Sequence, residues 1–252
     1  MAETILLEVT GLEKRFGGVR AVNGVDFSLR EGELLGIIGP NGSGKTTLVN
    51  LLTGFVKPDA GTIRYQGKVI TGWAPYRIAQ LGIARTFQMV RPFYQLPAFK
   101  NLIIPLYSPR VKKLSGGKFG DRDAVAKDLL EEVGFERDSY VTLKTASVLP
   151  HGYLKRLELA RCLSLRPDLL ILDELFSGLS MAEVASILPI IEKILLEGMT
   201  VIMIEHRLKE LFRIATRVLV MNFGEKIAEG LPKQVMESPS VQKAYLGTEE
   251  EG

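Results

Sequence analysis

The chain has 252 residues, of which 46% are hydrophobic and 24% are charged, and its formal net charge is +3. These values describe a globular protein long enough for one elaborated α/β domain or two closely joined lobes, and the small net charge gives no argument for nucleic-acid binding. The single cysteine, Cys162, excludes an internal disulfide, and no apolar run approaches the roughly 20 residues that a membrane-spanning helix needs.

Alternating polar and apolar residues near the N-terminus predict a pair of antiparallel strands. One strand is expected around Leu7 to Val9 and another from Val25 to Leu29, with a turn at Gly17 and Gly18 between them. The first four residues lack the basic and apolar blocks of a signal peptide, so we expect the chain to stay in the cytosol.

Residues 34–52 predict a strand, a glycine-rich loop and a helix in succession. Leu34 to Ile38 form a short apolar run that is typical of a buried strand, and Thr47 to Leu52 are expected to be helical. The connecting segment has the spacing of a phosphate-binding loop and consists of Gly39, Pro40, Asn41, Gly42, Ser43, Gly44, Lys45, Thr46 and Thr47.

The residue types in this loop suit the phosphates of a nucleotide. Gly42 and Gly44 permit backbone conformations in which successive N–H groups point at the phosphates, where the helix N-terminus adds partial positive charge. Lys45 is expected to reach the β- and γ-phosphates, and the Thr46 hydroxyl is expected to bind Mg²⁺. A plain glycine-rich turn is the alternative, but the flanking strand and helix are those that the motif requires.

The middle of the chain predicts a helical insertion. Several prolines punctuate residues 94–146, and Asp121 to Val133 has apolar residues at helical spacing. Just before this insertion, Gln88 closes a short predicted strand, and its side-chain amide could touch the metal ion or its water.

Two adjacent acids end the next apolar strand, which runs from Leu169 to Leu172. The carboxyl end of a strand is where α/β sheets present ligand groups, and successive side chains of a strand face opposite ways. We therefore expect Asp173 to help hold Mg²⁺ and Glu174 to orient or deprotonate the attacking water. A solvated acidic strand end is the alternative.

A third strand, Val201 to Ile204, leads into Glu205 and His206. A lone histidine at a strand end is usually structural. Because this strand would deliver His206 to the ligand edge of the sheet, we interpret it as a contact to the γ-phosphate.

Taken in chain order, these residues resemble the ATP-binding cassette (ABC) family, and the resemblance covers nearly the whole chain. The family order is an aromatic residue that stacks on the base, a phosphate loop, a glutamine loop, a signature motif, an acidic strand and a switch histidine. The matching residues are Phe16, Gly39 to Thr47, Gln88, Leu149 to Tyr153, Asp173 with Glu174, and His206. The resemblance implies that Phe16 stacks on adenine, although Phe16 could equally be a core aromatic residue.

The signature motif has an altered form, which consists of Leu149, Pro150, His151, Gly152 and Tyr153. A segment with a closer spelling, Leu114 to Lys118, does not lead into the acidic strand, so we interpret it as a loop. Residues Leu154 to Arg161, in contrast, are expected to form the helix that leads into the acidic strand. The resemblance implies that the N-terminus of this helix faces the γ-phosphate of ATP held by a partner subunit.

Four positions depart from the usual residues of the family: Pro150 for serine, Tyr153 for glutamine, Leu175 for proline and Ser180 for aspartate. The ATPases of branched-chain amino-acid importers resemble this chain in their signature, in the segment Gly82 to Gln88 and in the ending Ala244 to Gly247. The departures raise the hypotheses that the working unit is a heterodimer with a stronger paralogue, or that this subunit binds nucleotide with little catalysis.

The resemblance implies an α/β fold, namely a phosphate-loop ABC cassette with a mixed, mostly parallel sheet, an N-terminal antiparallel β subdomain and a helical subdomain. It implies one domain over residues 1–252, with a nucleotide-binding lobe at 1–93 and 147–252 and a helical subdomain at about 94–165. The implied cofactors are ATP and Mg²⁺, the latter held by Thr46, Gln88 and Asp173. Glu174 and His206 are the implied catalytic residues.

The expected function is ATP hydrolysis that powers a membrane transporter, with an importer of branched-chain or related amino acids or amides as the first candidate. An ATPase of the lipopolysaccharide-export type and a soluble ABC ATPase outside transport are the alternatives. The implied partners are a second ABC ATPase subunit, two permease subunits that dock near Arg91, Phe93 and Tyr94, and indirectly a substrate-binding protein, but no nucleic acid. The expected location is the cytoplasmic face of the inner membrane, as a peripheral subunit.

Overall fold

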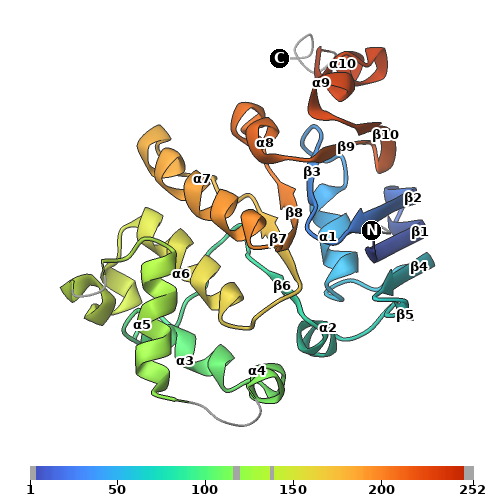
Figure 1. The fold of residues 1–252 in the computed structure, drawn as a ribbon. Coiled ribbons are helices and arrows are strands. Elements are labelled where there is room, and N and C mark those ends of the chain that lie inside the picture. Colours follow the sequence, from blue (N-terminus) through green and yellow to red (C-terminus); the bar gives the residue numbers. More distant parts are fainter. Residues whose placement is uncertain (1–3, 116–119, 137–138, 247–252) are drawn as a thin grey trace. The chain divides into compact units, whose positions relative to one another are not determined.

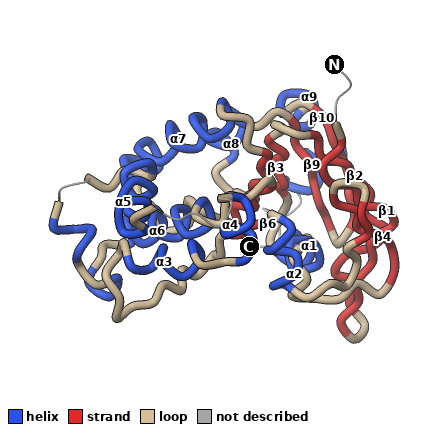
Figure 2. Tube along the Cα trace, turned by 60° about the horizontal axis from the view of Figure 1, so that its bottom comes forward, coloured by secondary structure: helices blue, strands red, loops and turns tan. Residues whose placement is uncertain are grey.

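The computed structural model describes residues 4–115, 120–136 and 139–246, and it divides the chain into two compact units (Figure 1). The strand-rich unit comprises the described residues up to Ile78 and from Gly198 onward, and the helical unit runs from Ala79 to Glu197. Most strands, drawn in red in Figure 2, belong to the strand-rich unit, and helices dominate the other.

The strand-rich unit contains two sheets. The bounds of its elements are β1 Ile5–Phe16, β2 Val19–Arg30, β3 Leu34–Ile38, α1 Lys45–Leu52, β4 Ala60–Tyr65, β5 Lys68–Val69, β8 Thr200–Ile204, α8 Leu208–Ile214, β9 Arg217–Asn222, β10 Glu225–Gly230, α9 Pro232–Met236 and α10 Pro239–Leu246. The chain passes to the other unit within α2, Pro75–Leu81.

The first sheet is antiparallel, with the order β2-β1-β4-β5. Its two long strands turn at Gly17 and Gly18, as predicted, because Gly17 adopts a left-handed φ of 57°. The N-terminal antiparallel subdomain is therefore confirmed.

The second sheet of this unit is built around β3, which pairs in parallel with β8 on one side and with β9 on the other, while β10 adds an antiparallel edge. Every residue of β3 and of β8 is buried. Continuous apolar strands of this kind are typical of parallel sheets covered on both faces. The predicted strands at 34–38 and 201–204 and the helix after the glycine-rich loop are confirmed.

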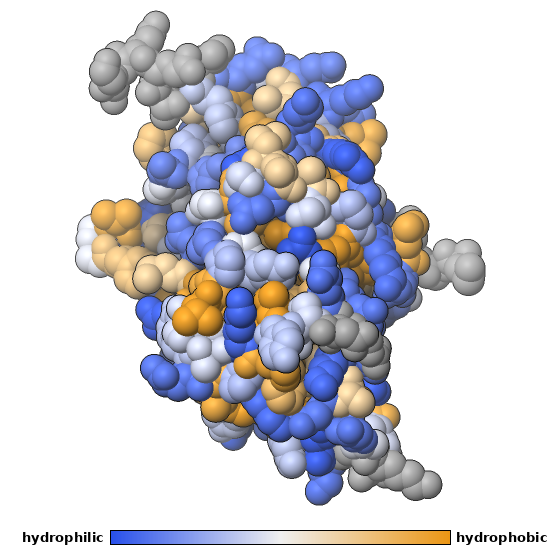
Figure 3. All heavy atoms as spheres, turned by 90° about the vertical axis from the view of Figure 1, so that its left-hand side faces the viewer, coloured by the Kyte–Doolittle hydropathy of each residue, from blue (hydrophilic) through white to orange (hydrophobic). Residues whose placement is uncertain are grey.

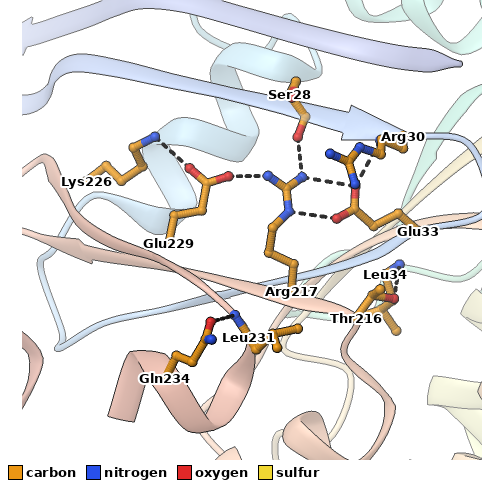
Figure 4. A network of polar contacts seen from close by, with 10 residues as sticks. All are labelled: Ser28, Arg30, Glu33, Leu34, Thr216, Arg217, Lys226, Glu229, Leu231 and Gln234. Atoms are coloured by element: carbon orange, nitrogen blue, oxygen red, sulfur yellow. Dashed lines mark hydrogen bonds and ion pairs between the residues drawn. The ribbon is translucent and has the colours of Figure 1, made fainter. Parts of the chain in front are cut away.

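A network of hydrogen bonds and ion pairs lies at the amino ends of β3 and β9 and connects them with β10 (Figure 4). Arg217, at the start of β9, donates through Nε and Nη2 to the two carboxylate oxygens of Glu33 at 2.7 and 3.0 Å. It also contacts Glu229 of β10 and the backbone carbonyl of Ser28 of β2. Glu33 is only 7% exposed, so its carboxylate has lost most of its hydration, and the ion pair with Arg217 offsets this desolvation cost.

The helical unit surrounds one short pair of parallel strands, β6 with β7. Its elements are β6 Ile83–Arg85, α3 Lys100–Leu106, α4 Pro109–Leu114, α5 Arg122–Glu132, α6 His151–Leu163, β7 Leu169–Asp173 and α7 Met181–Leu196, with 3₁₀ turns at Tyr140–Leu143 and Ala146–Val148.

The predicted helix near 121–133 is confirmed as α5, which begins after the N-cap residue Asp121. The side chain of Asp121 accepts the Asp123 amide at 2.9 Å, which satisfies one of the donors left open at a helix start. The predicted helix at 154–161 is confirmed as part of α6. Within the residues described, no helix combines the length and the apolar character needed to cross a membrane.

Candidate functional site

The glycine-rich loop connects β3 to α1, and its backbone conformation requires glycine at two positions. Gly44 has a φ of 103°, and a Cβ there would lie 2.2 Å from the carbonyl oxygen of Ala21. Gly39 has a φ of 151°, and a Cβ there would lie 2.1 Å from the carbonyl oxygen of Met221. Neighbouring backbone therefore lies so close to Gly39 and Gly44 that neither position has room for a side chain.

The polar groups of this loop are arranged for an anionic ligand. The Nζ of Lys45, which is 6% exposed, donates to the carbonyl oxygens of Gly39 at 2.7 Å and Pro40 at 2.9 Å. The buried Ser43 hydroxyl has no hydrogen-bond partner among the described residues. No side chain caps the N-terminus of α1, so its first N–H groups are available for a phosphate. A buried unpartnered hydroxyl, an ammonium group and an open helix start together suit a nucleotide phosphate.

His206 leaves the same edge of the sheet. Ile204, the last residue of β8, pairs in parallel with Ile37 of β3, so the two strands direct their following residues to one side. The His206 side chain is exposed there. Phe16, at the end of β1, is 50% exposed and is covered by the Lys14 ammonium 5.5 Å from its ring centroid. Its exposure argues against the core alternative.

The C-terminal tail also reaches the loop. Tyr245 of α10 accepts a hydrogen bond from the Gly39 amide, and burial raises the pKa of Tyr245 to about 12. The predicted ending Ala244 to Gly247 is described as far as residue 246, and Gly247 lies outside the described residues.

In the helical unit, Asp173 is held by Arg85. Both side chains are buried, at 3% and 6% exposure, and the Arg85 Nη2 lies 2.6 Å from the Asp173 Oδ2. The Asp173 amide donates to the hydroxyl of Thr86, and the Thr86 amide donates to Ile171 of β7. The arginine therefore neutralises the acid that was predicted to hold a metal ion.

Glu174 leaves β7 in a way that the strand pattern did not predict. Its φ is 50°, which is the left-handed region, so the alternation rule that placed it opposite Asp173 does not apply. Its Oε2 accepts the Nε2 of Gln88 at 2.7 Å. Gln88 itself lies beyond β6, which ends at Arg85, so the expectation that it closes this strand is wrong. The strand is shorter because only residues 83–85 pair with β7.

The signature residues form the start of α6, whose N-cap is Pro150 without any side-chain hydrogen bond. A Cβ on Gly152 would lie 2.4 Å from Oε1 of Glu183, whose carboxylate caps α7 through Ser180. Tyr153 packs its ring edge-on against the buried Phe135, with centroids 4.9 Å apart.

The segment that resembles the signature more closely lies elsewhere. Leu114 ends α4 and Ser115 caps it, while Gly116, Gly117 and Lys118 lie outside the described residues. Leu149, the first residue of the predicted signature, is buried directly before α6. The structure thus places the altered motif, rather than its decoy, at the start of the helix that leads into β7.

Two residues that the sequence reasoning missed lie on α6. Lys155 and Glu158 are only 2% and 4% exposed, and both contact the segment that contains Gln88. Burial raises the pKa of Glu158 to about 7, although the Phe87 amide and the cations Arg161, Lys155 and Arg85 act against it. Charged residues on a helix are usually solvated, so their type gave no sign of burial.

The fold and these residues define a nucleotide-binding protein with a phosphate loop. Residues 22–177 match the family model described as "ABC transporter", and residues 225–251 match one described as "Branched-chain amino acid ATP-binding cassette transporter". The chain belongs to the ABC transporter family and is an ATPase that binds and hydrolyses ATP.

Individual relatives agree over almost the full length. The chain is 40% identical to the high-affinity branched-chain amino acid transport ATP-binding protein BraF of Pseudomonas aeruginosa, with 96% of this chain and 98% of that protein covered. It is 37% identical to LivG of Escherichia coli, with the same coverage. It is also similar to the crystal structure of the ADP conformation of MJ1267, an ATP-binding cassette of an ABC transporter, with a TM-score of 0.83 and 32% identity over 97% of this chain and 99% of that one.

Proposed function

We propose that this chain is the ATP-hydrolysing subunit that powers an importer of branched-chain or related amino acids. The observation that carries the substrate class is the 40% identity to BraF over 96% of the chain, supported by the match of residues 225–251 to the branched-chain model. These similarities favour import over the lipopolysaccharide-export alternative. The segment Arg85 to Gln88 pointed to the same subfamily.

The strand-rich unit supplies the groups that would bind the nucleotide. The N–H groups of Gly42 and Gly44 and the first turn of α1 would surround the phosphates, and the buried Ser43 hydroxyl would gain a partner. Lys45 would exchange its two backbone carbonyls for phosphate oxygens. Phe16 would stack on adenine, for which its exposed ring is available. The remaining loop residues Gly39, Pro40, Asn41 and Thr47 shape this binding loop.

Thr46, Asp173 and Gln88 would hold Mg²⁺, which supplies charge neutralisation for the transferred phosphoryl group. Thr46 is exposed at the start of α1 and so is accessible to a metal ion. In this structure the Arg85 guanidinium orients the Asp173 carboxylate and neutralises its charge. Hydroxyl, carboxylate and amide oxygens are the hard ligands that Mg²⁺ prefers.

Glu174 would act as the base or orienting group for the attacking water. Its carboxylate accepts the Gln88 side-chain amide at 2.7 Å, which orients the carboxylate. His206 would contact the γ-phosphate from the edge that β8 and β3 share. These assignments give each of the predicted catalytic residues one chemical task.

The signature residues Leu149 to Tyr153 would complete the site of a second ATPase subunit. The start of α6 carries no capping side chain, which leaves its N–H groups for a partner's phosphate. ATP would then close the pair of subunits, and hydrolysis would reopen it.

A permease pair and, indirectly, a substrate-binding protein are the further proposed partners. Exposed apolar side chains in the helical unit offer a docking surface, including Met89, Phe93 and Tyr94 at 71%, 42% and 45% exposure. The face in Figure 3 carries small hydrophobic groups scattered among hydrophilic ones, without a single continuous apolar band.

A heterodimer with a catalytically stronger paralogue is the second candidate arrangement. Pro150 offers no hydroxyl to a phosphate, and Tyr153 is turned against Phe135 rather than left free. Both features would reduce the number of contacts that the signature residues of this chain make with ATP bound to the second subunit.

Copurification from membranes tests the proposal. We expect the tagged chain to bring two permease subunits with it and the complex to hydrolyse ATP faster when a branched-chain amino acid and its binding protein are added. Absence of permease subunits from the purified complex would refute the transport role. Robust cooperative hydrolysis by the chain alone would count against the heterodimer.

A further inference from the structure

Side chains on one face of α6 form hydrogen bonds with the backbone of the segment that contains Gln88. Lys155, Glu158 and Arg161 are spaced three residues apart, so they project from the same side of the helix. The Lys155 Nζ donates to the Gln88 carbonyl at 3.0 Å. Glu158 accepts the Phe87 amide at 2.6 Å, and Arg161 donates to the Arg91 carbonyl at 3.0 Å.

Lys155 has a second contact that the other two lack. Its Nζ also donates to the carbonyl of Glu174 at 3.2 Å. The same ammonium group therefore bridges the backbones of Gln88 and Glu174, whose side chains are hydrogen-bonded to each other at 2.7 Å. The result is a closed ring of hydrogen bonds that contains the proposed water-activating carboxylate.

The burial of Lys155 needs a reason. An ammonium group that is 2% exposed loses most of its hydration, which the two carbonyl contacts and the attraction of the neighbouring Glu158 carboxyl group must offset. A leucine or methionine would fill the same space without that cost. The backbone that Lys155 holds is itself unusual, since Glu174 has a left-handed φ that its neighbours must maintain.

We propose that Lys155 is a positioning residue for ATP hydrolysis, which fixes the backbone carbonyls of Gln88 and Glu174 so that their side chains meet in one geometry. Glu158 supports the same segment by holding the Phe87 amide. This inference rests on the proposed role of Glu174. It extends that role to a residue on the signature helix, so that a shift of α6 would be transmitted to the carboxylate through a single side chain.

Kinetics of Lys155→Gln and Lys155→Arg in the purified transporter complex test the inference. We expect Lys155→Gln to lower kcat by about 10- to 100-fold, the range for a small misplacement of catalytic groups, while KM for ATP stays within about twofold. Lys155→Arg should restore much of the rate, because a guanidinium can also donate to two carbonyls. Lys193→Gln, which removes an exposed lysine of α7, is the matched control and should leave both constants unchanged.

A second readout does not depend on turnover. Hydrogen exchange of peptides that cover residues 86–92 should become faster in Lys155→Gln, while exchange in α5 stays the same, and circular dichroism should confirm that the variant folds. An unchanged kcat in Lys155→Gln, or a proportional rise in KM, overturns the inference while the proposed function stands. If the wild-type complex does not hydrolyse ATP, the proposed function is refuted and the kinetic test does not apply. Hydrogen exchange remains decisive in that case, because an unchanged rate at residues 86–92 in Lys155→Gln would overturn the inference.

Discussion

The buried carboxyl group of Glu158 should make the stability of the helical unit depend on pH. Glu158→Gln removes the titration but keeps a side-chain oxygen that can accept the Phe87 amide, which Glu158 now accepts at 2.6 Å. The charged groups that face it are Lys155, Arg161 and Arg85, and the thiol of Cys162 lies nearby. The variant is therefore a conservative probe of one protonation equilibrium.

The magnitude follows from the pKa of Glu158, which burial raises from 4.5 to about 7. Between these two values the folded chain holds a proton that the unfolded chain has released, so the free energy of unfolding falls as pH rises. At about 1.4 kcal/mol per pH unit, the full loss is about 3 kcal/mol, complete above pH 7 and absent below pH 4.5. Relative to wild type, Glu158→Gln should thus gain about 3 kcal/mol between pH 4.5 and pH 8.

Urea unfolding followed by far-ultraviolet circular dichroism is the suitable assay, because most of the α-helical residues belong to the unit that contains Glu158. Tryptophan fluorescence is unsuitable, since the single tryptophan, Trp73, lies in the other unit. Glu132→Gln, at the exposed end of α5, is the control and should show no such trend. A stability difference between wild type and Glu158→Gln that stays constant from pH 5 to pH 8 would refute the reasoning.

Three further predictions concern the rest of the site and the fold. Glu174→Gln should bind ATP but lose turnover and accumulate a closed dimer, as measured by nucleotide binding and gel filtration, and undiminished hydrolysis would remove Glu174 from its role. Arg217→Met should destabilise the strand-rich unit by about 3 kcal/mol, because it leaves the buried Glu33 carboxylate without its ion-pair partner. Arg64→Met, from an exposed ion pair at 3.7 Å, should cost less than about 1 kcal/mol in the same urea titration. Gly44→Ala should abolish ATP binding in a nucleotide-binding assay, because its Cβ would lie 2.2 Å from a backbone oxygen, and wild-type affinity would show that the loop is not rigid.

Much of the site could be predicted because its signals are local. The strand, loop and helix around Lys45 are contiguous in the chain, and apolar periodicity is sufficient to place each of them. The start of α6 was located for the same reason, since the helix that leads into β7 is continuous with the signature residues. Position along the chain, rather than spelling, led us to assign the signature to Leu149–Tyr153 instead of the segment at Leu114.

Other features depend on contacts between residues that are distant in sequence. The pairing of Arg85 with Asp173 and of Gln88 with Glu174 joins residues nearly ninety positions apart, and no periodicity reports it. The left-handed backbone of Glu174 broke the alternation rule because neighbouring groups, rather than local propensity, determine it.

The amino-acid sequence by itself therefore determined the order of the elements, the phosphate loop and the family, since these follow from short-range patterns of apolar residues, glycines and charges. Only the tertiary structure decided which charged residues are buried and what they hold. Lys155 and Glu158 look like solvated helix residues in the sequence. The packing of α6 against the segment around residue 88 buries both side chains and brings them within hydrogen-bond distance of the backbone of Gln88 and Phe87.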